Sequence, residues 1–397
     1  MAKQSINVCL IGHKFMGRTH SNAYLKAPKF FTDLPVDPVM HTICGRNMEE
    51  LREFAARWGW KNASGDWKAA VSNPDVHLVD VGTPNNAHME MSIAALEAGK
   101  NVACEKPLAG SLSEARQMRD AARKAKGKTF VWYNYRRVPA VALAQQLVKA
   151  GKIGRVYHVR AFYLQDWAGP SVPLIWRFSK EVSGTGALGD LSAHVIDMAR
   201  FITGDEVTEV TGSALETFVK EREIPEQGSK GGIAGGAAAA KGKMGKVTVD
   251  DASIFIARTA GGALATFESS RFATGNQNKN GLEINGEKGA IRFNFEDMNW
   301  LEFYDTTVDR KQQGWAKIMV THAPDHPYAN AWWPDAHVIG YEHGFINQVA
   351  DMMMALGGRQ PTVPLPDFED AYKTQQVLEA AVLSAEQRRP VTIAEIG

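Results

Sequence analysis

The stretch Ile6-Asn7-Val8-Cys9-Leu10-Ile11-Gly12-His13-Lys14-Phe15-Met16-Gly17 decides the fold of the first part of the chain. Residues 6–11 are apolar except for one asparagine, which is typical of a strand that is covered on both faces. A glycine turn follows, and residues 18–25 have a helical pattern. A strand, a glycine turn and a helix N-terminus form a phosphate cradle, because unpaired backbone N–H groups and the helix dipole point to one place. The predicted phosphate-binding residues are Gly12, Lys14, Phe15, Met16 and Gly17.

This loop departs from the usual GxGxxG fingerprint at one position. Lys14 occupies the place of the second glycine, which normally lets a pyrophosphate approach the backbone. A lysine at that place can offer its charge to the phosphate instead. The alternative interpretation is an ordinary strand-to-helix turn without a ligand.

The pattern around this loop predicts the fold class. Apolar strands are expected over residues 39–44, 76–81, 102–104 and 129–133, and helical stretches alternate with them. This alternation predicts an α/β domain with a doubly wound, parallel Rossmann sheet. The pattern changes after Pro139 to alternating segments that predict a C-terminal α+β domain with a large, mainly antiparallel open sheet.

The expected domains are residues 1–135 for dinucleotide binding and residues 136–397 for substrate binding and oligomerisation. Two closing helices, over 345–356 and 368–386, are expected to pack back on the first domain or on the sheet edge.

The segment Val102-Ala103-Cys104-Glu105-Lys106-Pro107-Leu108 delivers charged residues to the end of a predicted strand. Ligands of an open α/β sheet bind outside the carboxyl ends of its strands, so Lys106 lies where a cofactor and a substrate could meet. The following proline restricts the backbone and thereby aims this side chain. The alternative for Lys106 is a solvated surface charge.

The end of the second strand bears on the choice of dinucleotide. A carboxylate at this place would bind the adenosine ribose hydroxyls of NAD, but the chain has Gly45-Arg46-Asn47. A small residue beside Arg46 favours the 2′-phosphate of NADP. The alternative for Arg46 is a solvated surface arginine, so both NAD and NADP stay open.

In the second part of the chain, alternation over residues 156–167 places Tyr163, Gln165 and Trp167 on one face of a strand. Aromatic rings and amides suit a sugar, which has apolar faces and a rim of hydroxyl groups. The alternative is a partly buried face that packs against a helix or another subunit.

A helix is expected over residues 190–202, with Asp190, His194 and Asp197 on one stripe beside an apolar stripe. An acid–imidazole–acid stripe is a candidate for catalysis. The alternative is a histidine that two carboxylates hold for structural reasons. In the irregular segment 322–341, His326 is a candidate for the wall of a substrate pocket, against an ordinary surface loop.

Composition excludes several other classes of function. The formal net charge of +1 gives no electrostatic case for a nucleic acid or an anionic membrane as partner. No apolar stretch approaches the roughly 20 residues of a spanning helix. The three cysteines lack metal-ligand spacing, so we expect no metal site and a reducing, cytoplasmic location. Residues 225–246, rich in glycine, alanine and lysine, predict a loop or lid.

Four motifs occur together in order: Gly12–Gly17, Thr83-Pro84-Asn85, Glu105-Lys106-Pro107 and Gly186-Ala-Leu-Gly-Asp190-Leu-Ser-Ala-His194-Val-Ile-Asp197. In this combination the chain resembles, over nearly its whole length, the Gfo/Idh/MocA (glucose-fructose oxidoreductase / inositol dehydrogenase / rhizopine catabolism) family. Four further segments resemble the levoglucosan dehydrogenases and glycoside 3-dehydrogenases of that family. They are Asn134-Tyr135-Arg136-Arg137, Tyr163-Leu164-Gln165-Asp166-Trp167, Trp176-Arg177-Phe178 and His326-Pro327-Tyr328.

The resemblance implies an NAD(P)-dependent dehydrogenase that oxidises a secondary ring hydroxyl of a sugar, anhydrosugar, glycoside (at C3) or cyclitol. The hydroxyl proton must leave before the hydride, so a base must reach that oxygen. We expect His194 to be the base, Asp190 to orient it or to accept a substrate hydroxyl, and Lys106 to stabilise the alkoxide. The roles of Lys106 and His194 could be exchanged.

The resemblance also implies two sets of contacts. Cofactor-binding residues beyond the phosphate loop are Arg46, Thr83, Pro84, Asn85, His88, Glu105, Lys106, Asn134 and Arg177. Substrate-binding residues are Lys106, Tyr163, Gln165, Trp167, Asp190, His194 and His326.

Two other functions stay open at this point. An NAD-dependent glycosidase would oxidise C3 only transiently, and a non-catalytic dinucleotide-binding sensor would have lost the lysine, aspartate and histidine that this chain has. We also expect a homo-oligomer, either a dimer or a tetramer, that associates through the open sheet face.

Overall fold

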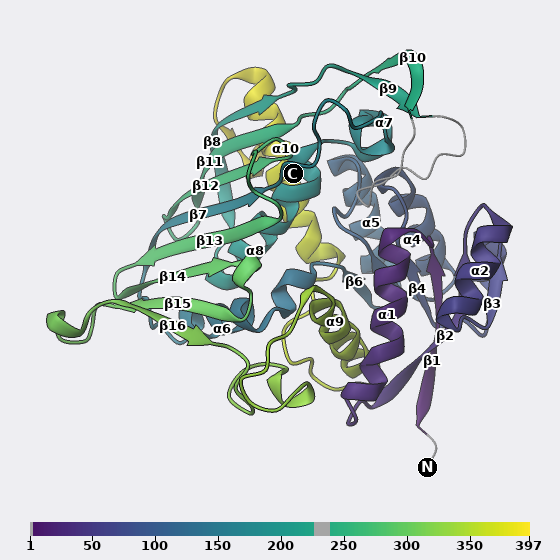
Figure 1. Ribbon diagram of the computed structural model, residues 1–397, viewed down its shortest axis with the longest axis horizontal. Helices are drawn as coiled ribbons and strands as arrows, with labels where there is room; N and C mark the ends of the chain where they lie inside the picture. Colours follow the sequence, from purple (N-terminus) through teal and green to yellow (C-terminus); the bar gives the residue numbers. More distant parts are fainter. Residues whose placement is uncertain (1–2, 226–238) are drawn as a thin grey trace. The chain divides into compact units, whose positions relative to one another are not determined.

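The computed structural model describes residues 3–225 and 239–397 (Figure 1). The chain forms two compact units, which we describe separately. The first comprises residues up to 137 together with 327–372, and the second comprises 138–326 together with 373–397. The domain boundary that we predicted after residue 135 would place residues 327–372 in the second domain. This boundary stays a prediction.

The first unit contains a six-stranded sheet in the order β3-β2-β1-β4-β5-β6. Every neighbouring pair is parallel, which confirms the predicted Rossmann sheet. The strand order reverses between β1 and β4, and ligands of such sheets bind at this switch point. The strands are β1 (Gln4–Ile11), β2 (Val36–Cys44), β3 (Asn62–Ser64), β4 (Leu78–Val81), β5 (Asn101–Cys104) and β6 (Thr129–Val131).

Helices cover this sheet and complete its core. Their bounds are α1 (Phe15–Phe30), α2 (Met48–Trp58), α3 (Trp67–Ser72), α4 (His88–Glu97), α5 (Leu112–Lys124) and α9 (Tyr341–Leu356), with short 3-10 turns η1 (Asn85–Ala87), η2 (Asn134–Arg137) and η7 (Ala329–Ala331). The late helix α9 packs on α1 (Figure 1), and its Phe345 joins Leu10 and Trp132 in the apolar core.

Helix α1 runs five residues beyond the predicted end at residue 25. Pro28 lies in its last turn, where a proline removes only one helical hydrogen bond. Strand β2 begins at Val36 rather than at residue 39.

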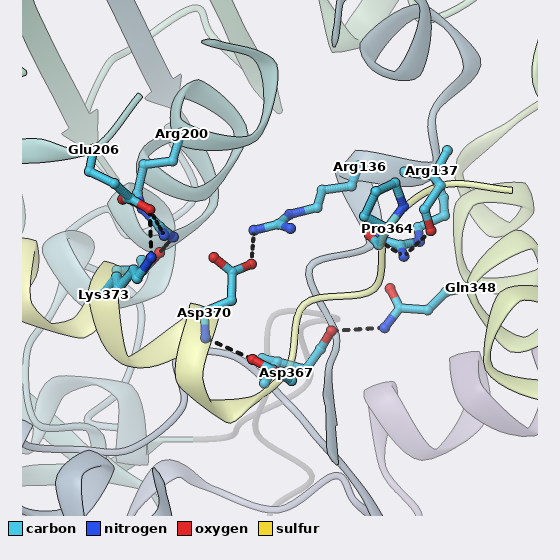
Figure 2. Close-up of polar contacts among 12 residues, drawn as sticks. Arg136, Arg137, Arg200, Glu206, Gln348, Pro364, Asp367, Asp370 and Lys373 are labelled. Atoms are coloured by element: carbon cyan, nitrogen blue, oxygen red, sulfur yellow. Dashed lines mark hydrogen bonds and ion pairs between the residues drawn. The ribbon is translucent and has the colours of Figure 1, made fainter. Parts of the chain in front are cut away.

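Two arginines of η2 anchor the chain within the first unit (Figure 2). Arg136 forms an ion pair with Asp370, with 2.6 Å between Nη2 and Oδ2. The Arg137 Nη2 group donates to the carbonyls of Val363 and Pro364 at 3.1 and 2.8 Å. These contacts hold residues 363–370 against η2, the turn that follows β6.

The second unit contains a nine-stranded sheet in the order β16-β15-β14-β13-β7-β12-β11-β8-β17 (Figure 1). Only the β7–β12 pair is parallel among its described pairs, which confirms the mainly antiparallel prediction. The strands are β7 (Val156–Leu164), β8 (Val207–Glu216), β11 (Ala252–Thr259), β12 (Leu264–Ser270), β13 (Lys279–Gly286), β14 (Gly289–Asn294), β15 (Trp300–Asp305), β16 (Trp315–Met319) and β17 (Val391–Thr392).

A separate hairpin pairs β9 (Glu221–Pro225) with β10 (Ala239–Lys246). The predicted loop over 225–246 is therefore wrong at its ends, where chain segments pair as strands. Residues 226–238 of that prediction lie outside the described residues.

The helical elements of the second unit are α6 (Pro139–Lys149), η3 (Trp176–Phe178), α7 (Lys180–Ser183), η4 (Leu188–Ser192), α8 (Ala193–Thr203), η5 (Phe295–Asp297), η6 (Arg310–Gln312) and α11 (Ile393–Ile396). Helix α10 (Phe368–Gln387) starts in the first unit and continues into the second. Within the second unit, Glu206 accepts from Arg200 Nε at 2.6 Å and from Lys373 Nζ at 3.0 Å (Figure 2). No described helix is both long and apolar enough to span a bilayer.

The predicted helix over 190–202 begins differently. A π-helical turn, η4, precedes the regular helix α8, and π turns are frequent at functional sites. The Asp250 carboxylate accepts from the N–H groups of Gly186 and Leu188, both at 2.7 Å, and so holds the start of this turn.

Candidate functional site

The predicted phosphate loop is closely packed against the loop after β4. Gly12 has φ +112°, and its N–H donates to the Cys44 carbonyl at 2.9 Å. A Cβ on Gly12 would lie 2.4 Å from the Gly82 oxygen, and one on Gly17 would lie 2.3 Å from the Gly12 oxygen. Both glycines are therefore required by the approach of backbone to backbone.

The start of α1 fits a dinucleotide phosphate. No side chain caps this helix, and its first turn has no acidic residue, so its first N–H groups remain available to an anion. Phe15 and Met16 form the first helical positions and are half-buried.

Lys14 has a protein partner beside this loop. Its exposed ammonium group forms an ion pair with Glu50 in the first turn of α2. The His13 ring lies 3.4 Å from the same carboxylate, and burial lowers the pKa of His13. Glu50 therefore competes with a phosphate for Lys14, a contact that the sequence did not predict.

The end of β2 is open to solvent. Arg46 is exposed, and Asn47 accepts from the N–H groups of Glu49 and Glu50, as the N-cap of α2. An exposed arginine at this place can meet a phosphate without a protein rearrangement.

His88 joins the loops that follow β4 and β5. Its imidazole is fully buried, with Nε2 3.0 Å from the Thr83 carbonyl and Nδ1 3.1 Å from the Pro107 carbonyl. A neutral ring donates to one of these oxygens, and an imidazolium donates to both. The side chain has no exposed atom for a ligand. Pro84 is half-buried beside it, and Asn85 is buried at the start of η1.

The loop after β5 presents Lys106 from a constrained backbone. Glu105 is buried, and its Oε2 accepts from the Lys106 N–H at 3.0 Å. The Lys106 side chain itself is half-buried. Asn134, another predicted cofactor residue, is buried in η2, and its carbonyl lies close to Gly344 of α9.

A buried ionic cluster lies beneath this loop. His20 of α1 places Nδ1 3.0 Å from Asp80 of β4 and Nε2 3.0 Å from Glu105. The Tyr24 hydroxyl and the Trp132 indole N–H also donate to Asp80, both at 2.9 Å. The His20 ring stacks on Trp132, with centroids 3.9 Å apart.

Two carboxylates decide the charge of His20. Burial by itself lowers the pKa of this imidazole, but the charge of Asp80, its hydrogen bond and the Glu105 carboxylate outweigh burial and raise the pKa to about 9. His20 is therefore an imidazolium at neutral pH. This cluster was not predicted from the sequence, although one signal was present: Asp80 is a charged residue inside an otherwise apolar strand.

In the second unit, the predicted sugar-binding side chains form a hydrogen-bonded row. Asn278 Oδ1 accepts from the Tyr163 hydroxyl at 2.8 Å and from Gln165 Nε2 at 2.7 Å. The Trp167 indole N–H donates to Gln165 Oε1 at 2.8 Å. Asn278 was missed because it precedes β13 and meets β7 only through the sheet.

His194 and Tyr163 meet on the same side of the sheet. His194 lies on α8 and is 8% exposed, and its ring centroid is 5.9 Å from that of Tyr163. Asp197, one turn further along α8, is buried. The structure thus brings the predicted base close to the row of predicted sugar-binding residues.

Asp190 has two arginine neighbours. Its Oδ2 accepts from Arg271 Nη2 at 2.8 Å and lies 3.7 Å from Arg177 Nε. Arg271 is fully buried and was not predicted. Asp190 is therefore held by cations, as a carboxylate that can still face a hydroxyl group because it is partly exposed.

His326 lies in the segment between β16 and η7. Its backbone N–H donates to the His322 carbonyl at 3.1 Å, and the two rings are 6.1 Å apart. The ring is half-buried.

Comparisons with known proteins agree with this arrangement. Residues 6–134 match the model of the oxidoreductase family with an NAD-binding Rossmann fold, and residues 141–292 match the GFO/IDH/MocA C-terminal domain. Levoglucosan dehydrogenase of Pseudarthrobacter phenanthrenivorans is 39% identical over 400 residues, which cover 99% of this chain and 100% of that protein.

Solved structures give the same result. An oxidoreductase domain protein from Kribbella flavida is 48% identical, with a TM-score of 0.91 over 98% of this chain and 99% of that one. A levoglucosan dehydrogenase in complex with NADH and levoglucosan is 38% identical, with a TM-score of 0.88 over 98% and 99%. The chain is therefore an NAD-binding oxidoreductase that belongs to the Gfo/Idh/MocA family.

Proposed function

We propose that this enzyme oxidises a secondary ring hydroxyl, at C3, of an anhydrosugar, sugar or glycoside. The observation that carries the proposal is full-length similarity to a levoglucosan dehydrogenase, with Lys106, Asp190 and His194 present at the motif positions. Cyclitols are the second substrate class, because a myo-inositol 2-dehydrogenase of Thermotoga maritima is 30% identical over 64% of the chain.

In this proposal the chain's own residues move the proton and bind the sugar. His194 accepts the hydroxyl proton, and Lys106 stabilises the alkoxide; the two roles exchange in the alternative assignment. Asp190, held by Arg271, accepts from a substrate hydroxyl. Bound dinucleotide supplies the hydride acceptor.

The predicted substrate contacts have the chemistry that a sugar requires. Tyr163, Gln165 and Trp167 combine ring faces with hydrogen-bonding groups, and Asn278 orients the first two. We add Asn278 to this set. His326 keeps its proposed place in the pocket wall.

The dinucleotide is proposed to lie on the phosphate loop. Its other contacts are Thr83, Pro84, Asn85, Glu105, Lys106, Asn134 and Arg177. The exposed Arg46 favours NADP over NAD, and Arg46→Ala should lower kcat/KM for NADP more than for NAD.

The test is turnover of the purified protein with NAD or NADP against anhydrosugars, monosaccharides, glycosides and inositols. We expect dinucleotide reduction with a C3-oxidised product, identified by NMR. Lys106→Ala and His194→Ala should each lower kcat by about 10²–10⁴-fold. His337→Ala, at an exposed histidine, is the matched control. Equal turnover by parent and variants would refute the assigned roles.

The same assay separates the two rival functions. A glycosidase would release an aglycone without net dinucleotide reduction. A sensor would bind dinucleotide and sugar without turnover.

We also propose self-association through the open face of the nine-stranded sheet, in the cytoplasm. Ile254 and Ile256 of β11 and Leu264 of β12 are 54%, 43% and 40% exposed on neighbouring strands. Exposed apolar side chains that gather in this way are typical of a protein interface. Light scattering should give a dimer or tetramer, and Ile254→Lys should lower the measured mass.

A further inference from the structure

We propose that His20 and His88 are positioning residues for Lys106. The buried His88 imidazole bridges the loops that follow β4 and β5, and the buried His20 imidazole bridges strand β4 and Glu105, so one ring acts on each side of this lysine. The inference rests on the proposed role of Lys106 in the reaction.

The first bridge lies on the C-terminal side of Lys106. His88 reaches the Pro107 carbonyl with one ring nitrogen and the Thr83 carbonyl with the other, at 3.1 and 3.0 Å. The ring belongs to the first turn of α4, so a regular helix carries both contacts. The backbone immediately after Lys106 is thus held to the loop that contains the Thr83-Pro84-Asn85 motif.

The second bridge lies on the N-terminal side. His20 contacts Asp80 of β4 and one oxygen of Glu105, while the other Glu105 oxygen accepts from the Lys106 N–H. The backbone that carries the lysine is therefore restrained at its own N–H group and at the residues before and after it.

Stability alone does not account for the His20 bridge. Two carboxylates and an imidazolium are buried there, and apolar residues of similar volume would fill the same space without the cost of removing charges from water. A fixed backbone, by contrast, directly serves a catalytic amine, because an error of about 1 Å in its position lowers a rate by about 100-fold.

A double-mutant cycle tests the inference in the full chain. His20→Gln and His88→Gln are made in the parent and in Lys106→Ala, and kcat, KM and the Kd for dinucleotide are measured. Each histidine substitution should lower the parent's kcat by about 10–100-fold and change the Kd for dinucleotide less than about threefold. In Lys106→Ala the same substitutions should change kcat less than about twofold, because no lysine remains to be positioned.

The matched control is His77→Gln. His77 is exposed, and it precedes β4 at the end of the strand opposite Thr83, so it should leave kcat unchanged in both backgrounds. Circular dichroism verifies folding. If His20→Gln does not fold, the pair His20→Gln with Asp80→Asn, which removes the imidazolium and the Asp80 carboxylate together, replaces it; His88→Asn replaces an unfolded His88→Gln.

Two results would overturn the inference. One is an unchanged kcat in the parent background, and the other is the same loss of kcat with and without Lys106, which means that the histidines act independently of it. If Lys106→Ala itself turns over like the parent, the proposed role of Lys106 fails instead, and this outcome is distinguished by that single variant.

Discussion

The surroundings of His20 and His88 differ in one respect, and the difference sets the charge of each ring. Both imidazoles are fully buried in the first unit, and each has two oxygen atoms 3.0–3.1 Å from its nitrogens. Burial lowers the pKa of both. For His20 the charges of Asp80 and Glu105 outweigh burial and raise the pKa to about 9. For His88 the backbone carbonyls and the charge of Glu105, which does not hydrogen-bond to this ring, do not outweigh burial, and the pKa stays lowered.

The comparison shows that burial does not by itself decide the protonation of a histidine. A carboxylate carries a full charge, whereas a backbone carbonyl carries only a partial one, so only the carboxylates recover the cost of removing an imidazolium from water. The His20 bridge is therefore ionic, whereas the neutral His88 ring donates to one of its two carbonyls and packs against the other.

The largest change in stability is expected from His20→Leu. This change leaves Asp80 and Glu105 buried without the imidazolium that lies between them, so we expect the free energy of unfolding to fall by about 3–5 kcal/mol. Urea denaturation measures it, with His77→Leu as the control, which removes one exposed hydrogen bond from the Asn7 N–H but no buried charge. A loss below about 1 kcal/mol would mean that the cluster is not ionic.

The two histidines should make stability depend on pH in opposite directions. The pKa of His20 is raised, so its stabilisation is complete below pH 6.5 and is lost as the pH rises through about 9, with a slope of up to about 1.4 kcal/mol per pH unit. The pKa of His88 is lowered, so stability falls as the pH drops below 6.5, where the unfolded state binds a proton that the folded state does not.

Urea titrations at several pH values measure these slopes in the parent, His20→Gln and His88→Gln. The alkaline slope should disappear in His20→Gln only, and the acidic slope should weaken in His88→Gln only. An unaltered alkaline slope in His20→Gln would assign it to another group.

The smallest effect is expected from His88→Gln. A neutral His88 ring donates to one of the two carbonyls, and the glutamine side chain does not hold its amide in the place of the ring, so losing this hydrogen bond should lower the free energy of unfolding by about 0.5–1.5 kcal/mol. Urea denaturation at pH 7.5 measures it. A loss equal to that of His20→Leu would remove the distinction between the two bridges.

Local patterns predicted most of the framework. The apolar run before Gly12 and the alternation of strands and helices correspond to β1 and the parallel sheet. Each depends on residues that are neighbours in the chain, because strand burial, helix capping and glycine turns are local properties. The π turn before α8 was not foreseen, because Asp250 holds its start from 62 residues away.

The order of strands, loops and helices and the identity of the candidate catalytic residues could be predicted from the sequence, because periodicity and turn residues specify structure over only a few positions. Only the tertiary structure decided which of these residues are partners. His20, Asp80 and Glu105 come from three separate segments, and Asn278 meets Tyr163 because β13, which it precedes, is the neighbour of β7 in the sheet. The physical reason is that charge pairing and burial depend on distances in space, which sheet register and helix packing set.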